Sequence, residues 1–293
     1  MLRRQSSTAC DLANVICPPW LNMHFASPEF VFWSETALKM AVTALFVSVA
    51  TVIAERLGPT VGALVATLPV SAGPVYVFLA LDHDAAFISM SAVASLALNA
   101  ATAIYLTIYV LLAQRYTIWI SASLAFAAWF AAALALSLIY WTAWSAFALN
   151  VVIFGSCFFI VEPFRFVHMP PTKRPWYDFL VRSTMVALLV GAVVTLSFRI
   201  GPAGSGVLAV FPVIYTSIMF ILHYRVGGPA TAAVLASAIP GLAGFGVALL
   251  TLHLTVSSLG SATALAFALG ISVAWNAAVY ATRRHQVADE VIE

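Results

Sequence analysis

Residues 33–70 read WSETALKMAVTALFVSVATVIAERLGPTVGALVATLPV, and residues 176–213 read WYDFLVRSTMVALLVGAVVTLSFRIGPAGSGVLAVFPV. The two stretches align without a gap at an offset of 143 residues, and the alignment extends to residues 82 and 225. Apolar residues match by chance, but the matches here include Trp33 with Trp176, two Gly-Pro pairs and two prolines within apolar runs. The pattern therefore predicts two copies of one structural unit.

The composition indicates that this unit lies in a membrane. Hydrophobic residues make up 63% of the 293 residues, charged residues make up 8%, and the mean hydropathy is +1.01. A soluble domain carries about 25% charged residues, and a soluble globule of this size could not bury so much apolar surface. In a bilayer the lipid is the solvent, and helices or closed barrels are the only structures that span it. We therefore expect an all-α, polytopic transmembrane bundle.

Reading the chain for spans of about 20 apolar residues gives nine candidates: 36–57, 59–81, 85–113, 117–139, 141–162, 177–198, 202–224, 229–253 and 258–281. They divide the chain into five parts: a tail (1–32), a first four-helix repeat (33–139), an extra span with a polar loop (140–175), a second four-helix repeat (176–285) and a C-terminal tail (286–293).

The extra span has a topological consequence. Four spans plus one place the second copy upside down in the membrane, which is the inverted-repeat architecture of many secondary transporters. With this count, nine of the 13 Lys and Arg residues fall on one side, including those of the loop at 163–176. The positive-inside rule then places that loop and the C-terminus in the cytoplasm. The expected location is a bacterial inner membrane.

Each copy has a proline within its second span, Pro69 and Pro212. Proline lacks an N–H and clashes with the carbonyl four residues back, and in lipid that carbonyl must find another partner or line a cavity. Interrupted helices at corresponding places in two inverted halves are the strongest sequence pointer to a substrate site. The site predicted here has polar neighbours from both copies, Ser71, Tyr76, Tyr215 and Thr216. The alternative is a purely structural kink in each helix.

A second candidate is the pattern Trp33-x-Glu35-x3-Lys39, which recurs with Asp178 and Arg182. An acid four residues before a base is a favourable pair on a helix, so Glu35 is expected to pair with Lys39. One reading is an anchor at the membrane interface, where bases snorkel outward. The other is that Lys39 and Arg182 turn inward to meet an anionic substrate, because ionisable residues within a membrane are costly and often functional.

The remaining polar residues suggest structure rather than chemistry. We expect the run Asp82-His83-Asp84 to be a solvated loop, and Glu162 to pair with Arg165. Three asparagines within spans are expected to donate hydrogen bonds between helices: Asn99, Asn150 and Asn276. No phosphate loop, nucleophile elbow, zinc pattern or cluster of basic residues is present, so the sequence predicts neither an enzyme, a metal site, a cofactor nor a nucleic-acid partner.

The run Arg56-Leu57-Gly58-Pro59, together with Gly62 and the segment through Pro69, resembles the GlpM-type family of small inner-membrane proteins, and the second copy is similar at Gly206 to Pro212. Members of that family resemble a single copy of this unit. They have a lysine early in the first helix, which Lys39 matches in this chain. The chain departs from it at Arg182, where the second copy lacks the lysine, and at Ser205, which stands in place of Gly62. The resemblance implies the fold and a link to exopolysaccharide production.

Two functions are compatible with these observations. The first is a small secondary transporter or permease for a small molecule or ion, with its site at the two proline-broken helices. The second is a non-transporting accessory protein for envelope or exopolysaccharide assembly. In both cases the lipid bilayer is the immediate partner.

Overall fold

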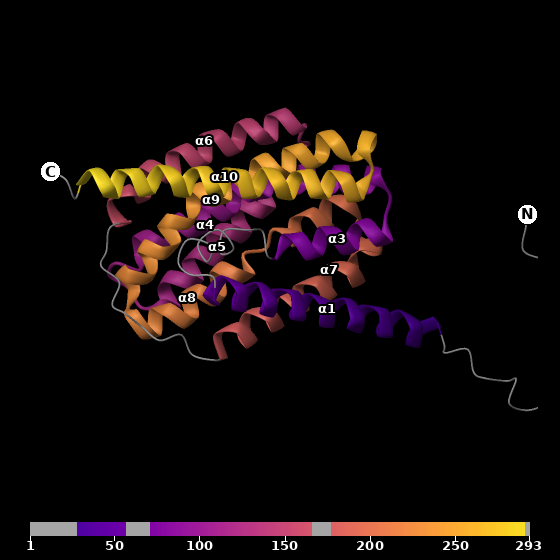
Figure 1. The fold of residues 1–293 in the computed structure, drawn as a ribbon, viewed down its shortest axis with the longest axis horizontal. Coiled ribbons are helices and arrows are strands. Elements are labelled where there is room, and N and C mark those ends of the chain that lie inside the picture. Colours follow the sequence, from indigo (N-terminus) through magenta and orange to yellow (C-terminus); the bar gives the residue numbers. More distant parts are fainter. Residues whose placement is uncertain (1–27, 57–70, 166–176, 291–293) are drawn as a thin grey trace, which may run out of the picture.

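The structure is a computed structural model, and it describes residues 28–56, 71–165 and 177–290. All regular elements in these ranges are helices (Figure 1). They are α1 (Pro28–Arg56), α3 (Ala72–Asp82), α4 (Ala85–Leu112), α5 (Ile118–Ser137), α6 (Ala143–Val161), the short 3-10 helix η1 (Glu162–Phe164), α7 (Tyr177–Ala209), α8 (Val213–Val226), α9 (Gly228–Leu259) and α10 (Ser261–Glu290).

Seven helical stretches of the described residues are long and apolar enough to cross a membrane, and α3 is a shorter apolar helix. The expectation of an all-helical, multi-pass membrane protein is confirmed at this level. Among the seven stretches α4 is the most buried, so it forms the centre of the bundle.

Both predicted tails are partly helical. Helix α1 begins at Pro28, inside the predicted tail 1–32, because proline suits the first position of a helix and Glu29 suits the positive end of its dipole. Helix α10 continues to Glu290, so the predicted C-terminal tail at 286–293 begins within a helix.

The predicted division between two spans at 199–201 is present as a junction within α7. Gly201 takes φ 69° and ψ −173°, which is not helical and which glycine adopts without steric cost, so α7 consists of two helical segments that meet at this residue. The second segment ends at Ala209, and α8 begins directly after Pro212. The matching stretch of the first copy, including Pro69, lies outside the described residues, and the description resumes at Ser71.

Helices α4 and α9 pack against each other and run in opposite directions. Ser89 hydrogen-bonds His253, Asn99 donates to the carbonyl of Leu242, and Ala113 closely approaches Gly228. Residue numbers thus rise along one helix as they fall along the other. We call the residue 143 positions away in the other copy the counterpart of a residue. The first residues of α4 and α9, Ala85 and Gly228, are counterparts in this sense.

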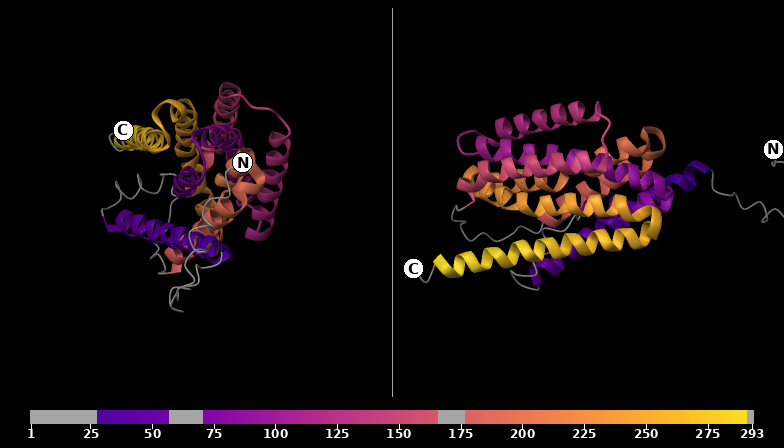
Figure 2. Two further views of the ribbon diagram at one scale, coloured as in Figure 1. Left: turned by 90° about the vertical axis from the view of Figure 1, so that its right-hand side faces the viewer. Right: turned by 90° about the horizontal axis from the view of Figure 1, so that it is seen from above.

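Other packed pairs follow the same correspondence. Helix α1 packs on α7, the first helix of each half, and the contact of α3 with α10 has its counterpart in the contact of α8 with α5. The helices run roughly along one axis, with α10 at the edge of the bundle (Figure 2).

Two asparagines join three helices at the centre. Asn99 donates to the side-chain oxygen of Asn150 at 3.0 Å and to the Leu242 carbonyl at 3.2 Å. Asn150 donates to the carbonyls of Leu96 and Ala146 at 2.6 and 2.9 Å. The prediction that Asn99 and Asn150 bond between helices is confirmed. The hydrogen bond described for Asn276 goes to Ser272 within its own helix.

We expect Asn150→Leu to lower the free energy of unfolding by about 1–2 kcal/mol, because interhelical side-chain hydrogen bonds in membranes contribute about this much. Unfolding in mixed micelles, followed by circular dichroism, measures the change. The matched control is Ser156→Ala on the same helix, since Ser156 is exposed and bonds only the Val152 carbonyl of its own helix. Equal effects of the two substitutions would contradict a special role for the asparagine pair.

Candidate functional site

Lys39 forms an ion pair with Asp82 at the end of α3, with Nζ–O distances of 2.5 and 2.7 Å. Both side chains are 16% exposed. The predicted pairing of Lys39 with Glu35 is therefore wrong, and Glu35 is exposed on α1. The physical reason is that charges attract more strongly in a partly buried, low-dielectric place than on a solvated helix surface. The pair fastens α1 to the junction of α3 and α4.

The positions that correspond to this ion pair in the second half carry two bases. The counterpart of Lys39 is Arg182, which lies half-buried on α7, and the counterpart of Asp82 is Arg225. The sequence repeat therefore conserves the first base but not its acidic partner.

The junction at Asp82-His83-Asp84, predicted to be a solvated loop, is half-buried at Asp82 and His83 and exposed at Asp84. Asp84 caps α4 by accepting a hydrogen bond from the Phe87 amide at 2.9 Å. The His83 ring stacks on the Phe87 ring with centroids 3.7 Å apart, and it hydrogen-bonds the Ser197 hydroxyl at 2.9 Å. Burial lowers the pKa of His83 despite the neighbouring acids, which favours the neutral imidazole. No group of three metal-ligating side chains occurs within the described ranges.

The break at Pro212 is surrounded by satisfied hydrogen bonds. Three hydroxyls on α4 donate to carbonyls of the segment before the break: Ser91 to Pro202 at 2.9 Å, Ser95 to Gly206 at 2.7 Å and Thr102 to Val210 at 3.3 Å. The Leu208 carbonyl, which the sequence predicted to be freed by Pro212, accepts from the Phe211 amide.

Of the residues predicted beside this break, Thr216 is buried and donates to the Pro212 carbonyl at 2.7 Å, and it also bonds the Tyr105 hydroxyl at 2.9 Å. Tyr215 is half-buried. The arrangement is the one expected of a structural kink, because the Leu208 carbonyl is satisfied within the chain and Thr102 of α4 donates to the Val210 carbonyl next to the break.

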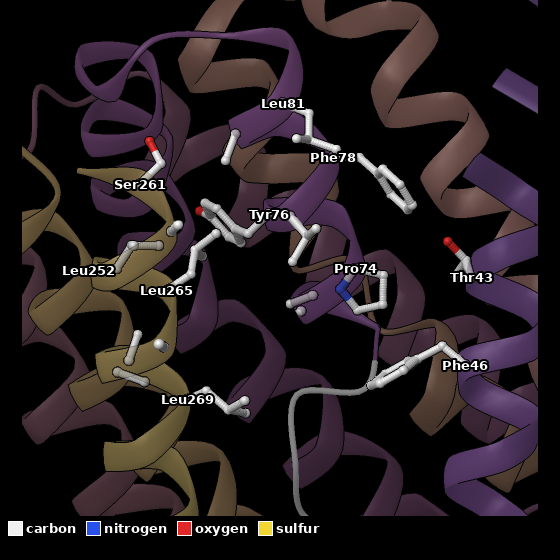
Figure 3. Close-up of a pocket in the computed structure, with 18 of the residues that line it drawn as sticks. Thr43, Phe46, Pro74, Tyr76, Phe78, Leu81, Leu252, Ser261, Leu265 and Leu269 are labelled. Carbon is white, nitrogen blue, oxygen red and sulfur yellow. The ribbon is translucent and has the colours of Figure 1, made fainter. Parts of the chain in front are cut away.

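A large cavity lies elsewhere, between α1 and α3 on one side and α9 and α10 on the other (Figure 3). Its volume is about 790 Å³, within the range of about 300–1,000 Å³ typical of ligand sites. Apolar residues make up nearly all of its walls, and the hydroxyl groups are those of Thr43, Tyr76 and Ser261.

The rim of this cavity reaches the outer surface of the bundle. Its lining residues Phe46, Leu81 and Leu269 are 52%, 72% and 50% exposed. Deeper lining residues such as Leu249 and Leu252 are buried. The cavity therefore opens toward the surface that faces lipid in a membrane.

The structure separates the predicted site residues. Tyr76 lines the cavity, Ser71 directly precedes its wall at Ala72, and Lys39 lies one helical turn before the lining residue Thr43. Thr216, Tyr215 and Pro212 lie in the other half, and Pro69 falls outside the described residues. Sequence reasoning missed the walls supplied by α9 and α10, because their alanines and leucines carry no chemical signal.

Comparison with family models, curated proteins and solved structures finds no match to this chain. The function is therefore inferred from the arrangement of side chains and cavities in the structure.

The first prediction from this site concerns the ion pair. Lys39→Met and Asp82→Asn are each expected to destabilise the protein, because each leaves a largely buried charge unpaired. The double variant should recover part of the loss, with a coupling energy of about 0.5–3 kcal/mol. Thermal unfolding in detergent measures the cycle. Glu35→Gln is the control and should leave stability unchanged. Additive losses in the double variant would show that the two charges do not interact.

A second prediction concerns the close approach of α7 to α4. A methyl group on Gly206 would lie 2.3 Å from the Ser91 carbonyl oxygen, whereas nothing lies within 4 Å of one on Gly155. We expect Gly206→Ala to cost about 1–3 kcal/mol through overpacking. Gly155→Ala should be neutral or slightly stabilising, because alanine is the better helix former. The melting temperature of each purified variant provides the comparison, and an unchanged Gly206→Ala variant would refute the packing argument.

Proposed function

We propose that this chain is a small secondary transporter or permease of the bacterial inner membrane, with its substrate site in the cavity between α1, α3, α9 and α10. The observation that carries this proposal is the position of the cavity. One wall comes from residues 42–50 and 72–81 and the other from residues 245–269, so the cavity lies between the two halves of the chain. Secondary transporters with repeated halves bind their substrates at the interface between the repeats.

The proposal includes the inverted repeat. The opposite directions of α4 and α9 support it, as do the contacts of α1 with α7 and the matching contacts of α3 with α10 and α8 with α5. The seven long stretches become nine crossings in two steps. The shorter helix α3 is counted as part of one further span, and the stretch of α7 and α8 is counted as two spans divided near Gly201. The cytoplasmic position of the C-terminus and the relation to GlpM-type proteins belong to the same proposal.

A second function is favoured by one observation. The polar groups at the Pro212 break are satisfied by Ser91, Ser95 and Thr102, and a helix packed in this way has no free group to offer a solute. This is the arrangement expected of a rigid accessory protein for envelope or exopolysaccharide assembly. The two functions differ in whether the walls of the cavity move.

The test is the distance across the mouth of the cavity. Spin labels are placed on cysteines at Leu81 and Leu269, which are exposed on opposite walls, in a variant whose native Cys10, Cys17 and Cys157 are replaced by serine. A transporter that alternates between two states should give two distance populations by pulsed electron paramagnetic resonance in nanodiscs. The control pair at Leu134 and Val152, exposed on α5 and α6, should give one. A single population at both pairs would favour the accessory function.

A further inference from the structure

The cavity exists because small or aliphatic residues stand where the counterpart positions carry aromatic and polar side chains. At the counterpart junction, Tyr105 of α4 bonds Thr216 of α8 at 2.9 Å and contacts the sulfur of Met219 at 3.1 Å. The counterparts of Tyr105 and Thr216 are Ala248 and Gly73, and both line the cavity.

The same replacement recurs one turn further along the helices. Tyr109 bonds the ring of His223 at 2.7 Å, and the counterparts of these two residues are Leu252 and Ala80. Both counterparts line the cavity. The junction of α4 with α8 is therefore closed by a hydrogen bond here, whereas the counterpart junction of α9 with α3 leaves space.

Aromatic packing is lost at the wall supplied by α10. Trp119 of α5 packs edge-on against Phe220 of α8, with ring centroids 5.7 Å apart. The counterparts are Ala262 and Val77, which again line the cavity. One junction thus shows how the fold fills this position, and its counterpart keeps it open.

The chemistry of the walls decides what enters. A water molecule in a cavity needs two to four polar partners, and apolar cavities stay dry. Two of the three hydroxyls in the lining already donate within the protein, Thr43 to the Lys39 carbonyl at 2.8 Å and Tyr76 to Ser95 at 2.7 Å. A polar solute would find almost no partner here, but a hydrocarbon chain needs none.

The elongated shape of the cavity and its exposed rim are those expected of a site that a hydrocarbon chain enters from the bilayer. Leu81 and Ser261 lie at one end of the cavity, and Phe46 and Leu269 lie at the other (Figure 3). On α3 the lining runs from Ala72 to Leu81, about 14 Å at roughly 1.5 Å per residue. The exposed rim at Phe46, Leu81 and Leu269 faces the region where lipid chains lie.

We infer that the cavity binds an acyl chain of a membrane lipid, with the polar end of the lipid beside Lys39 and Asp82. The inference rests on the proposed function, because it names the substrate class of the proposed transport site. Lys39 lies one turn before Thr43, and Asp82 directly follows Leu81, so the ion pair lies at the Leu81 end of the cavity. Lipid chains are as apolar as leucine, so transfer of a chain from the bilayer gains little by itself, and the ion pair supplies the polar contacts that select the lipid.

The experiment uses the full chain in nanodiscs that contain a phospholipid with a photoreactive diazirine on its acyl chain. After illumination, mass spectrometry maps the adducts. The inference predicts adducts on Leu249 and Leu252, which are buried lining residues, in addition to adducts on exposed residues such as Leu134.

The variant Gly73→Thr with Ala248→Tyr installs the pair that closes the junction of α4 with α8. It should lower the adducts on Leu249 and Leu252 about tenfold, equivalent to roughly 1.4 kcal/mol of lost binding free energy, and leave those on Leu134 unchanged. Val152→Tyr, at an exposed position of α6, is the matched control and should change neither. If the double variant does not fold, Ala262→Trp, which restores the counterpart of Trp119 at the wall, replaces it.

Absence of adducts on Leu249 and Leu252 in the unsubstituted chain, or equal adducts in the filled variant, would overturn the inference. Complete disulfide formation between Leu64→Cys and Leu265→Cys, in the background without native cysteines, would also overturn it, because the chain itself would then occupy the cavity. This experiment tests the lipid site separately from transport, which the spin-label distances test. Adducts together with a single distance population would support the lipid site and contradict transport. Two distance populations without adducts would support transport and contradict the lipid site.

Discussion

Within a bilayer, every backbone N–H and carbonyl must find its partner inside the protein, since the hydrocarbon offers none. The described part of this chain meets that constraint mainly within its helices, and α4 serves the stretch where the regular path is interrupted. Its hydroxyls at Ser91, Ser95 and Thr102 serve the carbonyls of the interrupted stretch before α8, and its Asn99 reaches the backbone of α9. A helix that leaves its regular path at 210–212 is tolerable in lipid only because a neighbour with hydroxyls at these positions lies against it.

The two junctions of counterpart helices differ in how they are filled. Between α8 and the helices α4 and α5, the space is filled by Tyr105, Tyr109 and Trp119 and their partners. Between α3 and the helices α9 and α10, the corresponding space is the cavity of about 790 Å³. Small side chains at one junction leave a space there, while large side chains keep the other junction packed.

The electrostatics divide in the same way. Lys39 and Arg182 are counterparts, but Lys39 is paired with Asp82 beside the cavity, whereas the counterpart of Asp82 is Arg225. A partly buried ion pair next to an apolar cavity offers both signs of charge to a polar headgroup, and its loss would leave an unpaired charge in a place of low dielectric constant. We therefore regard the end of the bundle at Asp82, His83 and Asp84 as the polar entrance of the proposed site.

The sequence by itself determined the class of structure, because composition and the length of apolar runs follow directly from the bilayer as solvent. It also predicted a repeat, and it located the central asparagines and the proline before α8, since each of these depends on residues that stand out within apolar runs. The partner of Lys39 and the location of the cavity were decided only by the tertiary structure. Asp82 lies 43 residues from Lys39, and no helical spacing links them. The cavity is made by Gly73, Ala80, Ala248 and Ala262, small residues that in sequence look like any other part of a membrane helix, and only packing shows where their missing side-chain volume adds up to one continuous space.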